Sequence, residues 1–130
     1  MAIVVLDASV AIAFLDAADP HHGGAVAALT RLQGNDMVLP ASAYAEMLVG
    51  PARRSPVAME AAREFVVDLA LRVEPINADI AERAARLRAA HRALKLPDAL
   101  VIATADALEA AHLLTADRTW ARVSKRARMI

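Results

Sequence analysis

Ile3-Val4-Val5-Leu6-Asp7 runs four apolar residues directly into a carboxylate. An apolar run of this length is typical of a strand that is buried on both faces, as in a parallel sheet. Asp7 is therefore expected at the end of a buried strand. Burying an unpaired carboxylate is costly unless something compensates, so its position needs a physical explanation.

Three further acids are set among apolar residues in the same way. Glu46 stands inside an apolar helical stretch, Asp98 opens the apolar run 99–103, and Asp117 follows the strand-like run 112–115. Each acid taken alone has an ordinary alternative: a helix cap or turn, a favourable place in the first turn of a helix, or a solvated surface glutamate. Four such acids in one chain favour a shared site.

Strand-like and helical segments alternate along the whole chain. Apolar runs predict further strands at 37–39 and 112–115, and residues 72–75 are expected to supply a short strand edge. Apolar spacing, capping residues and prolines predict helices that begin after Ser9, after Pro20, after Pro40, at Val57, after Asn77 and at Pro97. This order predicts one α/β domain over residues 1–130, a three-layer α/β/α sandwich around a mainly parallel sheet of four to five strands.

Several local features sharpen this prediction. Ser9 is expected to be the N-cap of the first helix, and Val26 is expected to face the core from the second. Gly50-Pro51 is expected to end the third helix, with a loop over 51–56. The basic ending at 120–130 is consistent with a short helix and an edge strand.

Composition excludes several classes of function. The chain is 58% hydrophobic and has no cysteine, so disulfides, zinc–thiolate sites and thiol catalysis are excluded. The four aromatic residues other than histidine provide few platforms for stacking nucleic-acid bases. No basic leader precedes the first apolar run, and no run is long enough to span a bilayer, so a soluble, cytoplasmic protein without membrane contact is expected.

Charge is unevenly distributed although the formal net charge is zero. Residues 1–82 carry five basic and eleven acidic side chains, giving −6, whereas residues 83–130 carry ten basic and four acidic, giving +6. The second half could face a polyanion, or its basic helix faces could simply be solvated.

The acids point to hard-cation chemistry. Ligands of an open parallel sheet bind beyond the carboxyl ends of its strands, and Asp7 and Asp117 both follow strands. Carboxylate oxygens are the natural ligands of Mg²⁺ and Mn²⁺, which activate water and stabilise charge in phosphodiester hydrolysis. Ser9 and Thr115 supply hydroxyls that could support the acids, although either could simply cap or end its element.

The sequence resembles the PIN-domain ribonucleases, especially the toxins of VapBC-type toxin–antitoxin pairs, over essentially its whole length. The resemblance lies in Val5-Leu6-Asp7-Ala8-Ser9, in Glu46 of the helix after the second strand, in Leu96-Pro97-Asp98-Ala99-Leu100-Val101-Ile102-Ala103 and in Leu113-Leu114-Thr115-Ala116-Asp117. Ala116 replaces the Asn that often precedes the fourth acid, and Trp120 stands where a smaller apolar residue or Phe is common.

The resemblance implies a metal-dependent endoribonuclease that cuts single-stranded RNA. The acids that would bind Mg²⁺ or Mn²⁺ are Asp7, Glu46, Asp98 and Asp117. Such toxins typically form homodimers and are held inactive by a cognate antitoxin, through which alone they would contact DNA. All of these properties are implied by the resemblance.

Two basic groups adjoin the proposed acids. They are Arg83, Arg86, Arg88, Arg92 and Lys95 before Asp98, and Arg118, Arg122, Lys125, Arg126 and Arg128 after Asp117. Arg118, Arg92 and Lys95 are the candidates for guiding the RNA backbone. The alternative is that these residues belong to an ordinary solvated helix face. His21-His22 is expected to be a solvated helix start, and no histidine has a companion at metal-ligand spacing.

Competing interpretations differ in testable ways. A receiver domain would carry an acidic pair in its first loop and a late lysine, and a dehalogenase-like phosphatase would have a second Asp where Ser9 stands. The serious alternative is a catalytically weak PIN-like module that binds RNA or protein. The intact set of four acids favours an enzyme.

Overall fold

The five strands of the protein form one parallel sheet in a computed structural model that describes all 130 residues. Their order is β3-β2-β1-β4-β5. The strands are β1 (Ile3–Leu6), β2 (Asp36–Pro40), β3 (Arg72–Glu74), β4 (His112–Thr115) and β5 (Ala127–Met129). The predicted α/β sandwich with a parallel sheet is confirmed, including the edge strand near the end of the chain.

Six α-helices and one short 3₁₀ helix connect the strands. They are α1 (Ala8–Leu15), α2 (His22–Arg31), α3 (Ala41–Arg54), α4 (Pro56–Asp68), α5 (Ala78–Ala90), α6 (Leu96–Ala107) and the 3₁₀ helix η1 (Arg118–Arg122). None of the helices combines the length and the apolar character that a bilayer-spanning segment requires.

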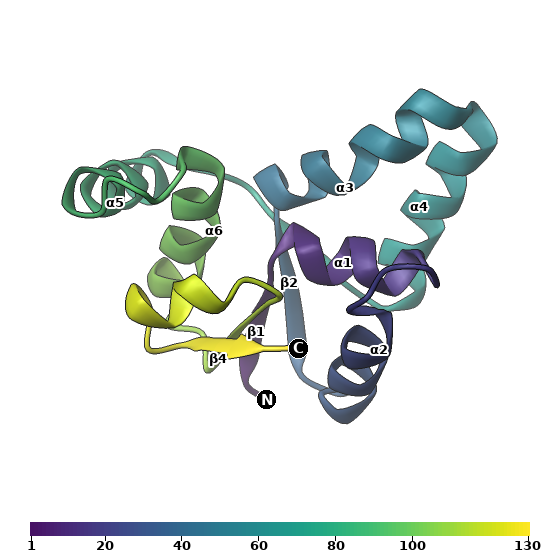
Figure 1. The fold of residues 1–130 in the computed structure, drawn as a ribbon, viewed down its shortest axis with the longest axis horizontal. Helices are drawn as coiled ribbons and strands as arrows, with labels where there is room; N and C mark the ends of the chain where they lie inside the picture. The colour runs from purple at the N-terminus through teal and green to yellow at the C-terminus, as the bar shows by residue number, and fades with distance from the viewer.

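The strand order decides which face each helix covers. The chain steps from β1 to β2 to β3 in one direction and then returns across the sheet to β4. Parallel connections are right-handed, so a reversal of direction moves the helices to the opposite face. Figure 1 shows this arrangement, with α1, α2 and α4 on one side of the sheet and α5 and α6 on the other.

The central strands form the core. Val4, Val5 and Leu6 of β1 are fully buried, as are Val38 and Leu39 of β2. Burial on both faces explains why these strands are continuous apolar runs and do not alternate with polar residues. The sheet interior is therefore aliphatic, as the composition predicts.

The reversal of strand order falls between β1 and β4, which lie side by side with Leu6 opposite Leu114. Both strands end at the same edge of the sheet. Helix α3 begins directly after β2, at that same edge, and contacts both α1 and α6. Ligands of open α/β sheets bind at such a switch point, so the topology marks this edge as the place for a site.

Three local predictions were wrong. Asp7, and not Ser9, occupies the N-cap position of α1, and its side chain makes no capping hydrogen bond. Val26 is 36% exposed, because α2 turns Ala25, Ala28 and Leu29 toward the core instead.

Helix α3 also continues past the predicted stop at Gly50-Pro51, and there is no loop over 51–56. Gly50 has no Cβ to clash with the proline ring, so it can keep a helical conformation before Pro51. The actual break is at Ser55, whose extended backbone precedes Pro56 and whose hydroxyl accepts a hydrogen bond from the Ala58 N–H at the start of α4.

Asn77 is expected to control the stability of α5. Its side-chain oxygen accepts a hydrogen bond of 2.9 Å from the Ile80 N–H, as predicted for an N-cap. Asn77→Ala should lower the free energy of unfolding by about 1 kcal/mol, whereas Asn77→Ser should retain most of it. Urea denaturation followed by tryptophan fluorescence measures both, and equal losses in the two variants would contradict a capping role.

Candidate active site

The four acids predicted from the sequence line one pocket at the carboxyl edge of the sheet. Asp7 lies between β1 and α1, Glu46 in α3, Asp98 in the first turn of α6, and Asp117 between β4 and η1. The pocket is also lined by Ser9, Ile12, His21, Ala116, Arg118 and Trp120. The structure thus brings together residues that are as far apart as 7 and 117 in the chain.

Asp7 is the most constrained of the acids. Its side chain is buried, and its Oδ2 accepts hydrogen bonds from the Ser9 hydroxyl at 2.7 Å and the Thr115 hydroxyl at 3.0 Å. The second oxygen, Oδ1, takes no part in these two bonds. Asp7 therefore presents a fixed carboxylate to the pocket.

The two hydroxyls have no freedom to turn away from Asp7. Ser9 Oγ accepts a hydrogen bond from the Ala116 N–H, and Thr115 Oγ1 accepts one from the Asp117 N–H. Since each oxygen receives a backbone donor, the hydroxyl proton is left to be donated to the carboxylate. These two bridges join the end of β1 to the segment after β4.

Asp117 is held in a different way. Its Oδ1 accepts hydrogen bonds from the Thr119 N–H at 2.8 Å and the Thr119 hydroxyl at 2.6 Å. Asp117 is thus the N-cap of η1, as the alternative for a turn acid anticipated. It is nevertheless exposed to the pocket, so capping and a place in the site are combined in one residue.

The pocket disfavours the negative charge of its own acids. Burial raises the pKa of Asp7 above its usual range, while the hydrogen bonds from Ser9 and Thr115 oppose this and the charge of Asp117 adds to it. Desolvation and the charges of Asp7 and Asp98 raise the pKa of Glu46. Like charges that are close together in a partly desolvated pocket each disfavour the ionised form of the others.

Asp98 shows the same effect at the start of α6. Its pKa is raised by burial first and then by the charges of Asp7 and Asp117, with Lys95 acting in the opposite direction. The helix N-terminus favours a negative charge, so the raised pKa means that burial and the neighbouring acids together outweigh that contribution. A positive ion in the pocket would relieve the repulsion among the acids.

The donor set suits a hard divalent cation. All four ligand candidates are carboxylates, and no cysteine or paired histidine is present to favour a softer metal. In the structure, however, no three acidic or histidine side chains are close enough to hold one ion together. Coordination of one ion by three or more of them would require the side chains to move closer together.

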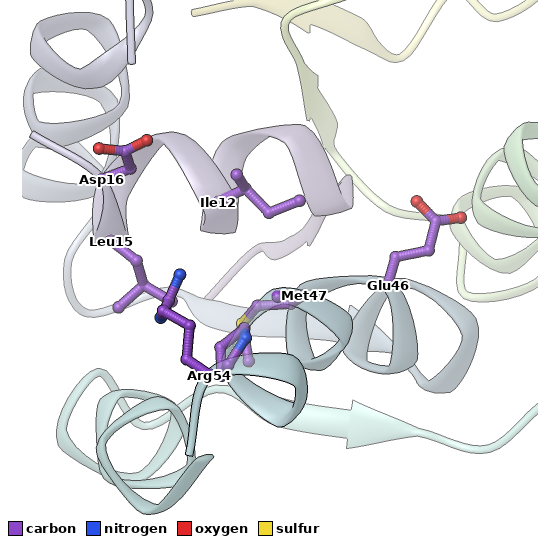
Figure 2. Close-up of a pocket in the computed structure, with 8 residues that line it drawn as sticks. Ile12, Leu15, Asp16, Glu46, Met47 and Arg54 are labelled. Atoms are coloured by element: carbon purple, nitrogen blue, oxygen red, sulfur yellow. The ribbon is translucent and has the colours of Figure 1, made fainter. Parts of the chain in front are cut away.

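A groove between α1 and α3 opens from the acid pocket. It is lined by Ile12, Leu15, Asp16, Glu46, Met47, Gly50, Pro51 and Arg54. Figure 2 shows Glu46 at one end of this groove and Asp16 at the other. Leu15 is 41% exposed there, whereas Phe14 packs on Phe65 with ring centroids 5.1 Å apart. Leu15, and not Phe14, is therefore available for contact.

The basic residues divide into two groups. Arg83 and Arg126 form ion pairs with Asp79 and Asp106, so their charges are partly compensated within the fold. Arg92, Lys95 and Arg122 form no ion pair and line a second pocket that shares Asp98 and Asp117 with the acid pocket. Arg118 lines the acid pocket itself.

The two adjacent histidines have different environments, so the expectation of one solvated pair was only half right. His22 Nδ1 lies 2.8 Å from the Ala13 carbonyl oxygen, and its ring lies beside Phe14. His21 is exposed and lines the acid pocket. Sequence analysis missed this place for His21, because only the fold of the α1–α2 connection brings residue 21 to the acids.

The comparisons with known proteins agree with this fold. The family model for the PIN domain matches residues 4–126. No curated protein matched the sequence.

Solved structures from three bacteria are similar to the chain. VapC20 of Mycobacterium tuberculosis, described as a sarcin-ricin loop cleaving toxin, has 21% identity and a TM-score of 0.76 over 92% of this chain and 93% of that one. A toxin–antitoxin complex from Klebsiella pneumoniae has 23% identity and a TM-score of 0.72 over 98% and 95%. FitAcB of Neisseria gonorrhoeae has 22% identity and a TM-score of 0.76 over 98% and 96%. At these identities the likeness is one of fold.

The Thr115 bridge is expected to be a major contribution to stability at this edge. Thr115→Val keeps the shape but leaves the Asp117 N–H and one Asp7 acceptor without a partner, so it should cost about 1–3 kcal/mol. Thr104→Val is a matched control, because Thr104 is equally buried and its hydroxyl only donates to the Leu100 carbonyl of its own helix. Urea denaturation measures the free energy of unfolding of both variants. An equal loss in the two would contradict a special contribution of the Thr115 bridge.

Asp98→Asn is expected to stabilise the metal-free protein at neutral pH. A raised pKa means that the folded state binds the proton more tightly than the unfolded state, so this carboxylate lowers stability as pH rises above its ordinary value of 3.8. The advantage of the variant should shrink as pH falls toward 4, where the wild-type acid becomes protonated.

Thermal unfolding in EDTA across this pH range tests the expectation for Asp98→Asn. Glu64→Gln, which removes an exposed acid from α4 outside the pocket, controls for the loss of one negative charge. A melting temperature for Asp98→Asn that is below that of the wild type at pH 7 would show that the charged form of Asp98 does not destabilise the folded protein.

Proposed function

The chain belongs to the PIN domain family, and on that basis we propose that it is a metal-dependent endoribonuclease and the toxin of a toxin–antitoxin pair. The observation that carries the proposal is the common pocket of Asp7, Glu46, Asp98 and Asp117 at the switch point of the sheet. Four carboxylates whose charges oppose one another are suited to binding a cation.

Mg²⁺ or Mn²⁺ bound among these acids would lower the pKa of a coordinated water and stabilise the charge of the reacting phosphate. Asp7 is the best candidate for a fixed ligand, because the two hydroxyl bridges hold its Oδ2 in place. Glu46 and Asp98 enter the pocket from α3 and α6 and would supply further carboxylate ligands. Ser9 and Thr115 position Asp7 and do not touch the substrate themselves.

The proposed reaction is hydrolysis of an RNA phosphodiester bond. A water oxygen bonds to phosphorus while one phosphorus–oxygen ester bond breaks, and the departing ribose oxygen gains a proton. The carboxylates orient the nucleophile and accept or deliver protons within the pocket. Arg118, which lines the same pocket, can contact a phosphate that is held at the acids.

The groove beside the acids suits a cognate antitoxin. Ile12 and Glu46 line both the groove and the acid pocket, so a peptide in the groove would approach the acids directly. The exposed apolar side chains of Ile12 and Leu15, with Arg54 nearby, would accept an amphipathic segment that has an acidic group. Contact with DNA would then be made by the antitoxin.

Dimer formation is the remaining part of the proposal. Helix α4 exposes Val57 and Val67, at 79% and 75%, on a surface away from the acids. Exposed apolar residues of this size suit contact with a second copy of the chain.

A catalytically weak module that binds RNA or protein is the second candidate. One observation favours it: no three of the acids are close enough together to hold one ion. Such a module would bind RNA without a metal requirement and without needing Asp98. Metal-dependent turnover therefore separates the two functions.

Asp98→Asn should abolish cleavage of single-stranded RNA while leaving the fold intact. We expect the wild type to cut total RNA or a fluorogenic RNA in Mn²⁺ and Mg²⁺ but not in EDTA, and the variant to be slower by about 100-fold or more, since it loses one negatively charged ligand of the proposed ion. Mn²⁺ should also quench the fluorescence of Trp120, the only tryptophan, which lines the acid pocket.

Glu64→Gln, on the outer face of α4, serves as the control and should cleave like the wild type. Two outcomes would count against the nuclease: cleavage that persists unchanged in Asp98→Asn, or folded wild-type protein that is quenched by Mn²⁺ but cuts no RNA of any class. The second outcome would favour the binding module.

A further inference from the structure

The second pocket, here called the basic trough, lies between the α5–α6 connection and η1. It is lined by His91, Arg92, Ala93, Leu94, Lys95, Asp98, Asp117, Thr119, Arg122 and Val123. Leu94 is buried and Val123 packs against the core, so the two walls are anchored to the fold. Arg92, Lys95 and Arg122 are exposed above them.

The basic charges of the trough are available to a ligand. The five ion pairs of the structure use other arginines, and the guanidinium groups of Arg92 and Arg122 donate no hydrogen bond to the protein. Arg92, Lys95 and Arg122 outnumber the two acids that line the trough, Asp98 and Asp117, so positive charge is left over. The trough is therefore prepared for an anionic partner.

The trough is continuous with the acid pocket. Asp98 and Asp117 line both, so a ligand that lies in the trough reaches the acids without crossing another element. A nucleic-acid strand repeats the same anionic group along its length, so one phosphate can lie at the acids while its neighbours lie over Arg92 and Arg122. An acidic peptide has no phosphodiester on which the proposed ion and acids could act.

We infer that the basic trough binds the phosphate backbone of single-stranded RNA next to the acid pocket, through Arg92 and Arg122. This inference rests on the proposed function and assigns the substrate path to one side of the acids. The trough has no Phe, Tyr or Trp on which a base could stack. It therefore supplies affinity that depends on charge, and base preference must arise elsewhere.

The salt dependence of RNA binding tests the inference without cleavage. Asp7→Asn protein is used throughout, because Asp7 does not line the trough and its loss prevents turnover during the measurement. Binding of a short fluorescein-labelled single-stranded RNA is followed by fluorescence anisotropy at increasing KCl concentrations. Arg92→Gln/Arg122→Gln is compared with Arg31→Gln/Arg53→Gln, which removes the same charge from exposed sites outside both pockets.

Loss of two phosphate contacts should lower the slope of log affinity against log salt by about 0.7 for each arginine, and should weaken binding roughly tenfold near physiological salt. The control pair should bind like the parent protein. Oligouridylate and oligoadenylate should lose affinity by the same factor. Lys95 is left unchanged because its charge acts on Asp98.

Three results would overturn the inference. They are an unchanged slope in Arg92→Gln/Arg122→Gln, an equal loss in the control pair, or a loss confined to one of the two homopolymers. If RNA affinity stayed constant while binding of labelled polyglutamate fell, the trough would be a protein-docking surface instead. A protein that binds RNA through the trough but cuts none would refute the proposed nuclease and support the inference.

Discussion

The hydrogen bonds that two hydroxyl groups make to Asp7 Oδ2 are the contacts on which the site depends. Ser9 comes from the first turn of α1 and Thr115 from the end of β4, and each also receives a backbone N–H from the segment after β4. A buried carboxylate without these donors would be more strongly driven to take up a proton. The Thr115 bond, together with the bond from the Ala116 N–H to Ser9 Oγ, also links the end of β1 to the end of β4, so the fold and the charge of Asp7 are maintained together.

Electrostatic repulsion is the second constraint on this edge of the sheet. The parallel topology places the ends of β1 and β4 side by side, and α3 and α6 bring two more acids to the same pocket. Burial first, and then the charges of neighbouring acids, raise the pKa values of Asp7, Glu46 and Asp98. Placing these acids together lowers the free energy of unfolding, and hydrophobic burial of the central strands has to offset that loss.

The surface around the acids is divided by chemistry. The groove between α1 and α3 is lined partly by apolar side chains and shares Ile12 and Glu46 with the acid pocket. The basic trough on the other side shares Asp98 and Asp117. This division is consistent with the uneven charge of the sequence, since the groove is built from the acidic first half and the trough from the basic second half.

The sequence by itself determined the class of fold and the identity of the acids. Continuous apolar runs such as Ile3–Leu6 specify strands buried on both faces, and an acid directly after such a run is conspicuous because its burial is costly. Local signals also placed the cap at Asn77 correctly. They failed at Gly50-Pro51, where the absence of a Cβ on Gly50 let the helix continue.

Only the tertiary structure decided how the four acids are held and what lies beside them. The bond between Thr115 and Asp7 joins residues 108 positions apart, and no local spacing encodes it. The same applies to His21 at the acid pocket and to Arg92 facing Arg122 across the trough. These neighbours arise because right-handed crossovers and a reversal of strand order bring distant loops to one edge, which is a property of the whole chain and not of any segment.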